Sequence, residues 1–74
     1  HAFAHHMIGV AYMMGEGVEK DINQAIEWFE KAAEFKIPGP MYTLGMLFED
    51  GKEVPQDLEK AQEWYDRASE INTP

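Results

Sequence analysis

The sequence predicts an all-α fold, an α-solenoid of two helix–turn–helix repeats, because two observations agree. The first is internal repetition: a shift of 36 residues places Gly9 on Gly45 and Trp28 on Trp64 without an insertion. Such a fixed period is typical of stacked helical repeats. The second is that apolar residues recur three and four positions apart between segments rich in glycine and proline, as in amphipathic helices.

The period defines repeat 1 as residues 1–38 and repeat 2 as residues 39–74, together one domain. Two repeats are fewer than the roughly three that a solenoid usually needs for independent stability. We therefore expect the chain to be a piece of a longer array. Tyr12 and Phe48 form a conservative pair in the same register. Identical pairs include Gly9/Gly45, Gly15/Gly51, Asp21/Asp57, Ala25/Ala61, Trp28/Trp64 and Ala32/Ala68.

The first helix of each repeat is predicted over residues 3–14 and 41–50. Gly15 and Gly51 follow these helices, and glycine readily adopts the left-handed conformation that terminates a helix. The segment 37–40, Ile-Pro-Gly-Pro, is assigned to the boundary between the repeats, because proline cannot continue a helix.

The second helix of each repeat is predicted over residues 22–36 and 58–71. Asp21 and Asp57 precede these helices, and a carboxylate at that position accepts hydrogen bonds from the first backbone N–H groups. Asp21 with Gln24 has the spacing of a capping box, in which the N3 side chain bonds back to the N-cap amide.

One face of each second helix is predicted to be buried. Gly9 and Gly45 lie within the first helices, where glycine costs about 1 kcal/mol relative to alanine, so we expect a close helix–helix approach there. Trp28 and Trp64 are large enough to span the joint between helices. The predicted buried residues are Ile22, Ala25, Ile26, Trp28, Phe29, Ala32, Ala33, Leu58, Ala61, Trp64, Tyr65 and Ala68. The exposed faces are expected to carry the i,i+4 ion pairs Glu27–Lys31 and Glu63–Arg67.

Together these motifs closely resemble a known repeat. Repeat 1 reads Gly9-x-x-Tyr12-x-x-Gly15-x-Gly17-Val18-x-x-Asp21, then Ala25-x-x-Trp28-Phe29-x-Lys31-Ala32-Ala33. This run, and its copy over nearly all of repeat 2, resembles the Sel1-like repeat. Pro40, Glu53 and Ser69 depart from the pattern, which expects alanine, glycine and alanine. The departure at Glu53 leaves the shape of the second turn open.

The resemblance implies both a fold and a role. Sel1-like repeats are related to tetratricopeptide repeats, and their antiparallel helix pairs stack into a right-handed superhelix. Members of the family act as adaptors and scaffolds in protein complexes and are not themselves enzymes. We therefore predict a protein–protein interaction module that presents a concave helical surface. The alternative is a structural spacer or capping segment within a larger repeat protein, with no ligand of its own.

The candidate partner-binding residues are Phe3, Met7, Val10, Met14 and Met46, which we call the first-helix stripe. In this architecture the first helices tend to line the concave face. The stripe is apolar and separate from the face used by the repeat pattern, and two interpretations are open. It packs on a preceding repeat or on a second copy of the chain, or it forms a methionine-rich groove for a partner helix or peptide.

Charge and composition limit the classes of partner that the chain is expected to bind. The net charge of −8 repels phosphate backbones and anionic membrane surfaces, so we expect neither nucleic acid nor membrane binding. Basic patches on a protein partner would complement this negative charge. The alternative is that the acidic residues only form solvated helix faces. The absence of cysteine excludes a thiol nucleophile and is compatible with the cytoplasm. No apolar run is long enough to cross a bilayer.

No catalytic, cofactor or metal site is predicted. Glu30 and Glu34 lie on a predicted solvent face, whereas acid–base catalysis needs carboxylates in a pocket. Ser69 has no histidine nearby in sequence. His1 and His5 have a helical metal-binding spacing, but no carboxylate lies close to them in sequence, so the histidines are assigned as surface residues.

Overall fold

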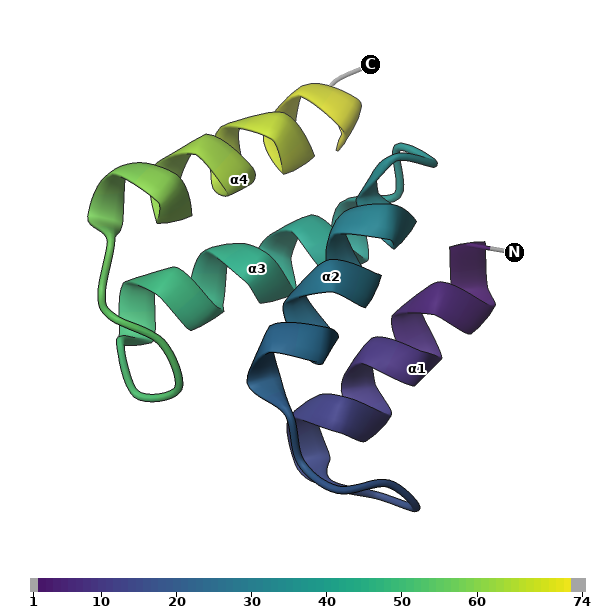
Figure 1. Ribbon diagram of the computed structural model, residues 1–74. Helices are drawn as coiled ribbons and strands as arrows, with labels where there is room; N and C mark the ends of the chain where they lie inside the picture. Colours follow the sequence, from purple (N-terminus) through teal and green to yellow (C-terminus); the bar gives the residue numbers. More distant parts are fainter. Residues whose placement is uncertain (1, 73–74) are drawn as a thin grey trace.

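The chain folds into four helices arranged as two antiparallel pairs (Figure 1). The computed structural model describes residues 2–72. Helix α1 spans Ala2–Met14 and packs against α2, Ile22–Ala33, and helix α3 spans Pro38–Asp50 and packs against α4, Leu58–Asn72. Over residues 2–72 the backbone forms no strand. The predicted all-α solenoid of two helix pairs is confirmed.

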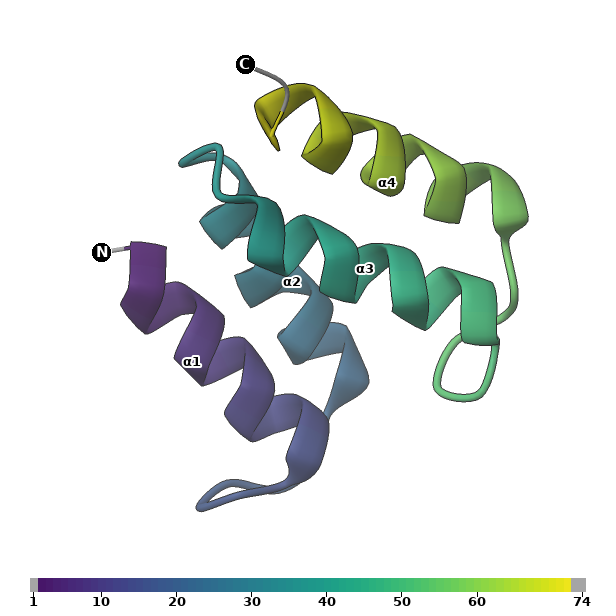
Figure 2. The ribbon, with the colours of Figure 1, turned by 180° about the vertical axis from the view of Figure 1, so that it is seen from behind.

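The helices form two layers. Helices α1 and α3 form one layer and line a hollow between them. Helices α2 and α4 form the other layer and line a second hollow. From behind, α3 passes in front of α2 (Figure 2). Helix α2 also packs on α3, which joins the two pairs. The Cα atoms extend over 38 × 29 × 13 Å, so the molecule is a thin plate.

The helix ends follow the predicted local chemistry. Gly15 and Gly51 have left-handed φ angles of 74° and 69° immediately after α1 and α3. Asp21 and Asp57 each accept a hydrogen bond from the backbone N–H three residues further on, at 3.2 and 3.1 Å. Each second helix therefore begins with one of its otherwise unpaired N–H groups satisfied by a carboxylate.

The capping box predicted for Asp21 and Gln24 is only half formed. The Asp21 backbone N–H donates to the Tyr12 carbonyl at 3.0 Å, so it is not free for the Gln24 side chain. In repeat 2 the Asp57 N–H donates to the Phe48 carbonyl in the same way, at 2.9 Å. These two bonds close the turns and set where each second helix starts.

The turn of repeat 2 differs from that of repeat 1 at Glu53. In the first turn Gly17 has a left-handed φ of 77°. Glu53, at the matching position, does not, because Lys36 is the only non-glycine residue with a positive φ among those described. The Glu53 carboxylate instead lies 2.9 Å from the Lys20 ammonium and links the two turns. The departure therefore alters the turn, while the bond that closes the turn is kept.

Helix α2 ends three residues earlier than predicted. It stops at Ala33, because the following turn tightens: the Phe35 N–H bonds to the Ala32 carbonyl at 3.1 Å and the Lys36 N–H to the Ala33 carbonyl at 2.9 Å. Lys36 then takes a left-handed φ of 61°. Such i→i+3 bonds commonly close a helix before the chain turns away.

Helix α3 begins earlier than predicted. It starts at Pro38, so assigning all of 37–40 to the boundary was wrong. The first residues of a helix have no intrahelical partner for their N–H groups, so Pro38 and Pro40 are tolerated there. Pro40 is fully buried against the rest of the fold.

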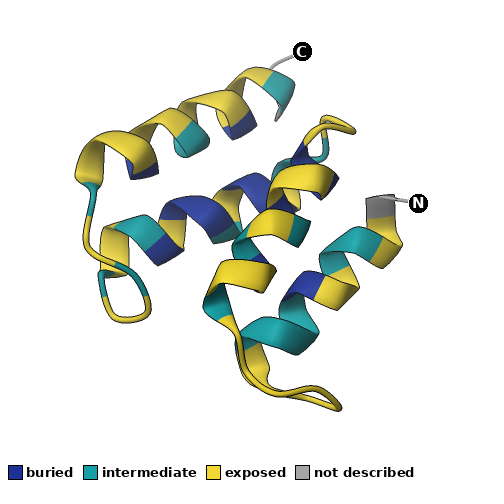
Figure 3. Cartoon of the chain, in the orientation of Figure 1, coloured by how far each residue is buried: buried dark blue, intermediate teal, exposed yellow. Residues whose placement is uncertain are grey.

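The core is a row of buried residues between the layers (Figure 3). Trp64 is half-buried and packs against two clusters, one shared by α2 and α3 and one shared by α2, α3 and α4. Leu58, predicted to be buried, is 60% exposed because no helix covers that side of α4. The first cluster contains Ala25, Phe29, Leu44 and Leu47, and the second contains Ala33, Met41 and Ala68.

An aromatic ring lies over Gly9 and over Gly45, the glycines in the middle of α1 and α3. A Cβ at Gly9 would stand 2.7 Å from Cε1 of Phe29, and one at Gly45 would stand 2.6 Å from Cε1 of Tyr65. Real side chains do not approach so closely. The close approach predicted at these glycines is therefore made by an aromatic ring of the paired helix.

The predicted i,i+4 ion pairs are not formed among the described residues. Lys31 lies over the Trp28 ring at 4.5 Å from its centroid, and Arg67 lies over the Trp64 ring at 4.8 Å. A cation over an indole face is favoured electrostatically. The cations turn toward the i−3 tryptophans and away from Glu27 and Glu63.

Candidate partner-binding surface

Four of the five residues of the first-helix stripe are exposed. They belong to α1 and α3, the helices seen in front when the molecule is viewed from behind (Figure 2). Phe3 and Met7 are 67% and 51% exposed, and Met14 and Met46 are 61% and 56% exposed. Large apolar side chains gathered on one exposed face are a common feature of interaction surfaces. The methionines add adaptable thioether side chains to this face.

Val10 differs from the rest of the stripe. It is half-buried and packs against the cluster that contains Phe29 and Leu44. The helical spacing places Val10 on the stripe, but it lies at the edge that turns toward the core. A charge at Val10 would therefore disturb the fold together with any binding.

A hollow of about 210 Å³ continues the stripe between α1 and α3. Met13 lines it from α1, and Met46 and Leu47 line it from α3. Thr43 and Asp50 complete the lining and place a hydroxyl and a carboxylate beside the apolar side chains. This combination would accept an apolar side chain of a partner and place a cation of that partner near Asp50.

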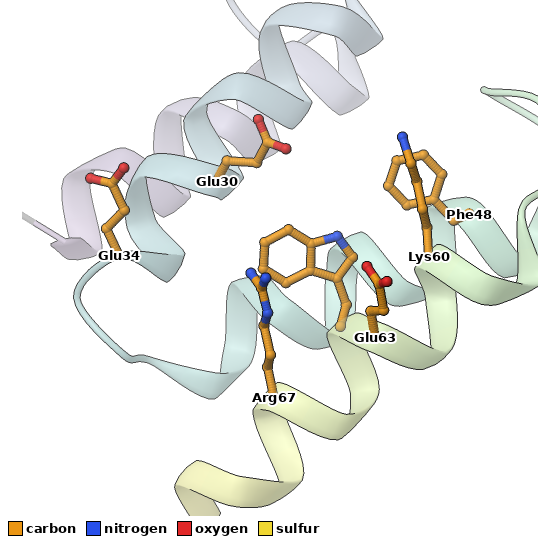
Figure 4. Close-up of a pocket in the computed structure, with 7 residues that line it drawn as sticks. Glu30, Glu34, Phe48, Lys60, Glu63 and Arg67 are labelled. Carbon is orange, nitrogen blue, oxygen red and sulfur yellow. The ribbon is translucent and has the colours of Figure 1, made fainter.

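A second, larger hollow, which was not predicted from the sequence, lies on the other side of the molecule. Its volume is about 450 Å³, and α2 and α4 form its walls (Figure 4). Glu30 of α2 and Glu34, which directly follows α2, lie on one side of the hollow. Lys60 and Arg67 of α4 lie on the other side. Phe48, Glu63 and Trp64 complete the lining.

The two cations of this second hollow are held by aromatic rings. Arg67 lies over the Trp64 ring, and Lys60 lies 5.3 Å from the centroid of the Phe48 ring. The tryptophan–cation spacing occurs at the same register in both repeats, Trp28 with Lys31 and Trp64 with Arg67. That recurrence was the signal available in the sequence, but the hollow itself needed the relative positions of three helices.

The assignment of the histidines as surface residues was wrong for His5 and His6. Both are half-buried. The His5 ring lies 5.4 Å from the Trp28 ring and 5.7 Å from the Phe35 ring, and the His6 ring meets Phe29 edge-on at 5.6 Å. Both helix positions face the neighbouring helices, so the imidazoles pack like core aromatics.

His1, considered with His5 for metal binding, lies outside the described residues, and residues 2–72 contain no group of three His, Asp or Glu side chains placed to hold a metal ion. Burial, and then the hydrogen bond to Glu49 and its negative charge, raise the pKa of Tyr65. The Tyr65 hydroxyl donates to that carboxylate at 2.8 Å.

Membrane insertion through a helix finds no support within residues 2–72. None of the four helices combines the length and apolar character that crossing a bilayer requires. The longest, α4, has 15 residues and carries charged side chains on its exposed face.

The sequence matches a family model described as Sel1 repeat over residues 2–34 and again over residues 41–72. The two matches fall on the two helix pairs, α1 with α2 and α3 with α4. No curated protein matches the chain.

Solved structures give the same result. The chain is similar to a Sel1 repeat protein from Oxalobacter formigenes, with 34% identity and a TM-score of 0.88. It is also similar to a protective antigen of uropathogenic Escherichia coli strains that displays an SLR fold, with 36% identity and a TM-score of 0.88. The matches cover 99% and 100% of this chain but only 29% and 16% of the two neighbours, so it spans less than a third of their length.

Proposed function

Because the chain belongs to the Sel1 repeat family, we propose that it is an adaptor or scaffold module that binds a protein or peptide through the face formed by α1 and α3. Sel1 repeats are generally protein–protein interaction modules and their fold is non-catalytic. The exposed members of the first-helix stripe, together with the adjoining hollow, are the contact surface. The favoured partner presents an apolar helix or extended segment flanked by basic residues, which suits the net charge of −8.

One observation carries this proposal over the interpretation that the stripe only packs on a preceding repeat. Helix α3 already has a preceding helix pair stacked against it, and the residues of α3 that match Phe3, Val10 and Met14 are exposed all the same. A further pair stacked on α1 in the same way would leave Phe3 and Met14 uncovered, whereas Met7 corresponds to Thr43, which is half-buried. The matching exposed residues of α3 are Gly39, Met46 and Asp50.

The second candidate function is a structural spacer or capping segment. The polar outer face of α4 favours it, since exposed polar side chains such as Gln62 and Asp66 suit the end of a stack. A spacer would tolerate charges on the stripe, whereas a binding module would lose its partner.

A matched pair of double variants tests the proposal. Met7→Glu with Met14→Glu charges the stripe without touching Val10, and Val18→Glu with Leu58→Glu makes the same charge change at exposed apolar positions elsewhere. Helicity by circular dichroism should match the natural chain in both. We expect proteins captured from the source lysate, measured by quantitative mass spectrometry, to fall at least about tenfold with the stripe variant alone.

Two results would contradict the proposal. Equal capture by the natural chain and the stripe variant would remove the stripe from binding. Equal losses with both variants would attribute binding to net charge. The first result, with the fold intact, would favour the spacer.

A further inference from the structure

The outer face of α1 is an uncovered copy of a face that is covered elsewhere in the same molecule. On α3, Pro40 and Leu44 are fully buried, and Leu44 lies in one cluster with Ala25 and Phe29 of α2. Their counterparts one period earlier are Ala4, which is exposed, and Ile8, which is 37% exposed against 0% for Leu44. The same positions with the same apolar character therefore lack only the covering helix.

The outer face of α4, at the other end of the stack, differs in chemistry. In α2, Ile22, Ile26 and Ala33 contribute to the clusters that join the repeats. One period later Leu58, Gln62 and Ser69 occupy these positions. Leu58 is apolar and 60% exposed, whereas Gln62 and Ser69 are polar and exposed. Gln62 donates a hydrogen bond to the Asp66 carboxylate at 2.8 Å, so this face carries its own polar contacts.

Polar residues also replace apolar ones where α3 and α4 pack together. Glu49 occupies the position of Met13, and Tyr65 occupies that of Phe29. The Tyr65 hydroxyl donates to the Glu49 carboxylate at 2.8 Å. Phe29 is fully buried and Met13 packs against its cluster, whereas Tyr65 is half-buried and Glu49 is exposed.

We propose that the stack is directional: the outer face of α1, formed by Ala4, Ile8 and Ala11, receives the second helix of a further helix pair, and the outer face of α4 closes the stack. The occupant is an amphipathic helix with the chemistry of α2, offering isoleucine and alanine where Ile22, Ile26 and Ala33 stand. The packing of α2 on Leu44 of α3 is the established interface that this proposal continues. It is independent of ligand binding by the stripe.

Extending the chain at either end with the same segment tests the proposal. One variant carries a second copy of residues 3–38 inserted before Phe3, in register with the period, so that a copy of α2 meets α1. The other carries the same copy of residues 3–38 after Pro74, so that a copy of α1 meets α4. We expect the first extension to raise the melting temperature by at least about 5 °C and the second to leave it unchanged.

Ile8→Glu supplies the control. In the 74-residue chain this position is partly exposed, and we expect the melting temperature to change by less than about 2 °C. In the chain extended before Phe3, the same change in the inner copy should abolish the increase, because it buries a charge. In the chain extended after Pro74, Gln62→Ile with Ser69→Ala should produce the increase that the natural α4 does not allow.

Three results would overturn the proposal. The first is an equal rise in melting temperature from extension at the two ends. The second is an increase that survives Ile8→Glu in the inner copy. The third is a dimer of the 74-residue chain, seen by sedimentation equilibrium, that Ile8→Glu converts to a monomer, because the occupant would then be a second copy of this chain.

Discussion

The rings of Phe29 and Tyr65 stand where Gly9 and Gly45 have no side chain, so a single missing Cβ sets the distance within each helix pair. Intrinsic helix propensity favours alanine over glycine by about 1 kcal/mol. A Cβ at Gly9 would approach within 2.7 Å of the Phe29 ring, and Phe29 is fully buried. Packing therefore outweighs propensity at this residue.

Gly9→Ala is expected to destabilise the chain by about 1–3 kcal/mol, as overpacking usually does, measured by urea denaturation. Gly39→Ala is the matched control, because a Cβ there meets only His6 at 3.6 Å, an ordinary contact. The control should be neutral or stabilising. Equal effects of the two substitutions would show that propensity, and not the Phe29 contact, governs the glycines.

Tyr65 gives the fold a pH dependence at the alkaline end. Its pKa is raised above the ordinary value of about 10, because burial and the Glu49 carboxylate disfavour the phenolate. The contribution to stability is fully present below the unfolded pKa and is lost as the pH rises through the folded pKa. We expect a tyrosine titration followed at 295 nm to show a late group, Tyr65, which loses its proton at a pH above the ordinary tyrosine range.

Glu49→Gln is the control for this titration. It keeps a hydrogen-bond acceptor beside Tyr65 but removes the charge, so the late group should move toward the ordinary range while the burial contribution remains. An unchanged titration curve would mean that Glu49 does not influence Tyr65.

Among the elements, the second helices depend most on their first turn. Asp57 caps α4 by accepting the Lys60 N–H at 3.1 Å, and no second bond completes a capping box because lysine occupies the N3 position. Asp57→Ala should lower the free energy of unfolding by about 1 kcal/mol. Asp57→Asn keeps a side-chain acceptor and should retain most of that stability in the same urea titration. If Asp57→Asn lowers the free energy of unfolding as much as Asp57→Ala does, the charge of Asp57, and not its hydrogen bond, stabilises α4.

The helices themselves could be predicted from apolar spacing, but their ends could not all be. Glycine and aspartate identified the end of α1 and the starts of α2 and α4, because these residues bond locally. The start of α3 was predicted too late, since the rule that proline ends a helix does not apply to the first turn. The end of α2 depends on a tightened turn and a left-handed Lys36, which no residue type announces.

The candidate surface was predictable to the same extent. The spacing of Phe3, Met7 and Met14 identified an apolar stripe, and these residues are exposed. The burial of Val10 and the aromatic packing of His5 were not predictable, because both depend on how closely the neighbouring helices approach. The hollow between α2 and α4 was missed for the same reason.

At the scale of the whole molecule, the two repeats share one core. Leu44 lies in the cluster that joins α2 to α3, and Trp64 packs against both clusters. Leu44→Ala should lower the free energy of unfolding by about 2–5 kcal/mol. It should affect both repeats equally, because neither buries its own share of this cluster without the other.

One tryptophan in each repeat allows this cooperativity to be measured. Trp28→Phe and Trp64→Phe leave single reporters in repeat 2 and repeat 1, respectively. We expect fluorescence and circular dichroism to give one coincident urea transition in each variant, with and without Leu44→Ala. Separate transitions for the two reporters would mean that the repeats unfold independently.

The polar outer face of α4 has a consequence for assembly. Head-to-tail contact between identical units adds subunits without limit unless the rotation closes a ring, which is how fibres form. The exposed Ile8 end of one copy would meet Gln62 and Asp66 of the next, and these already bond to each other. We expect this mismatch to suppress the elongation step of polymerisation, so that an apolar end on the chain does not lead to filaments.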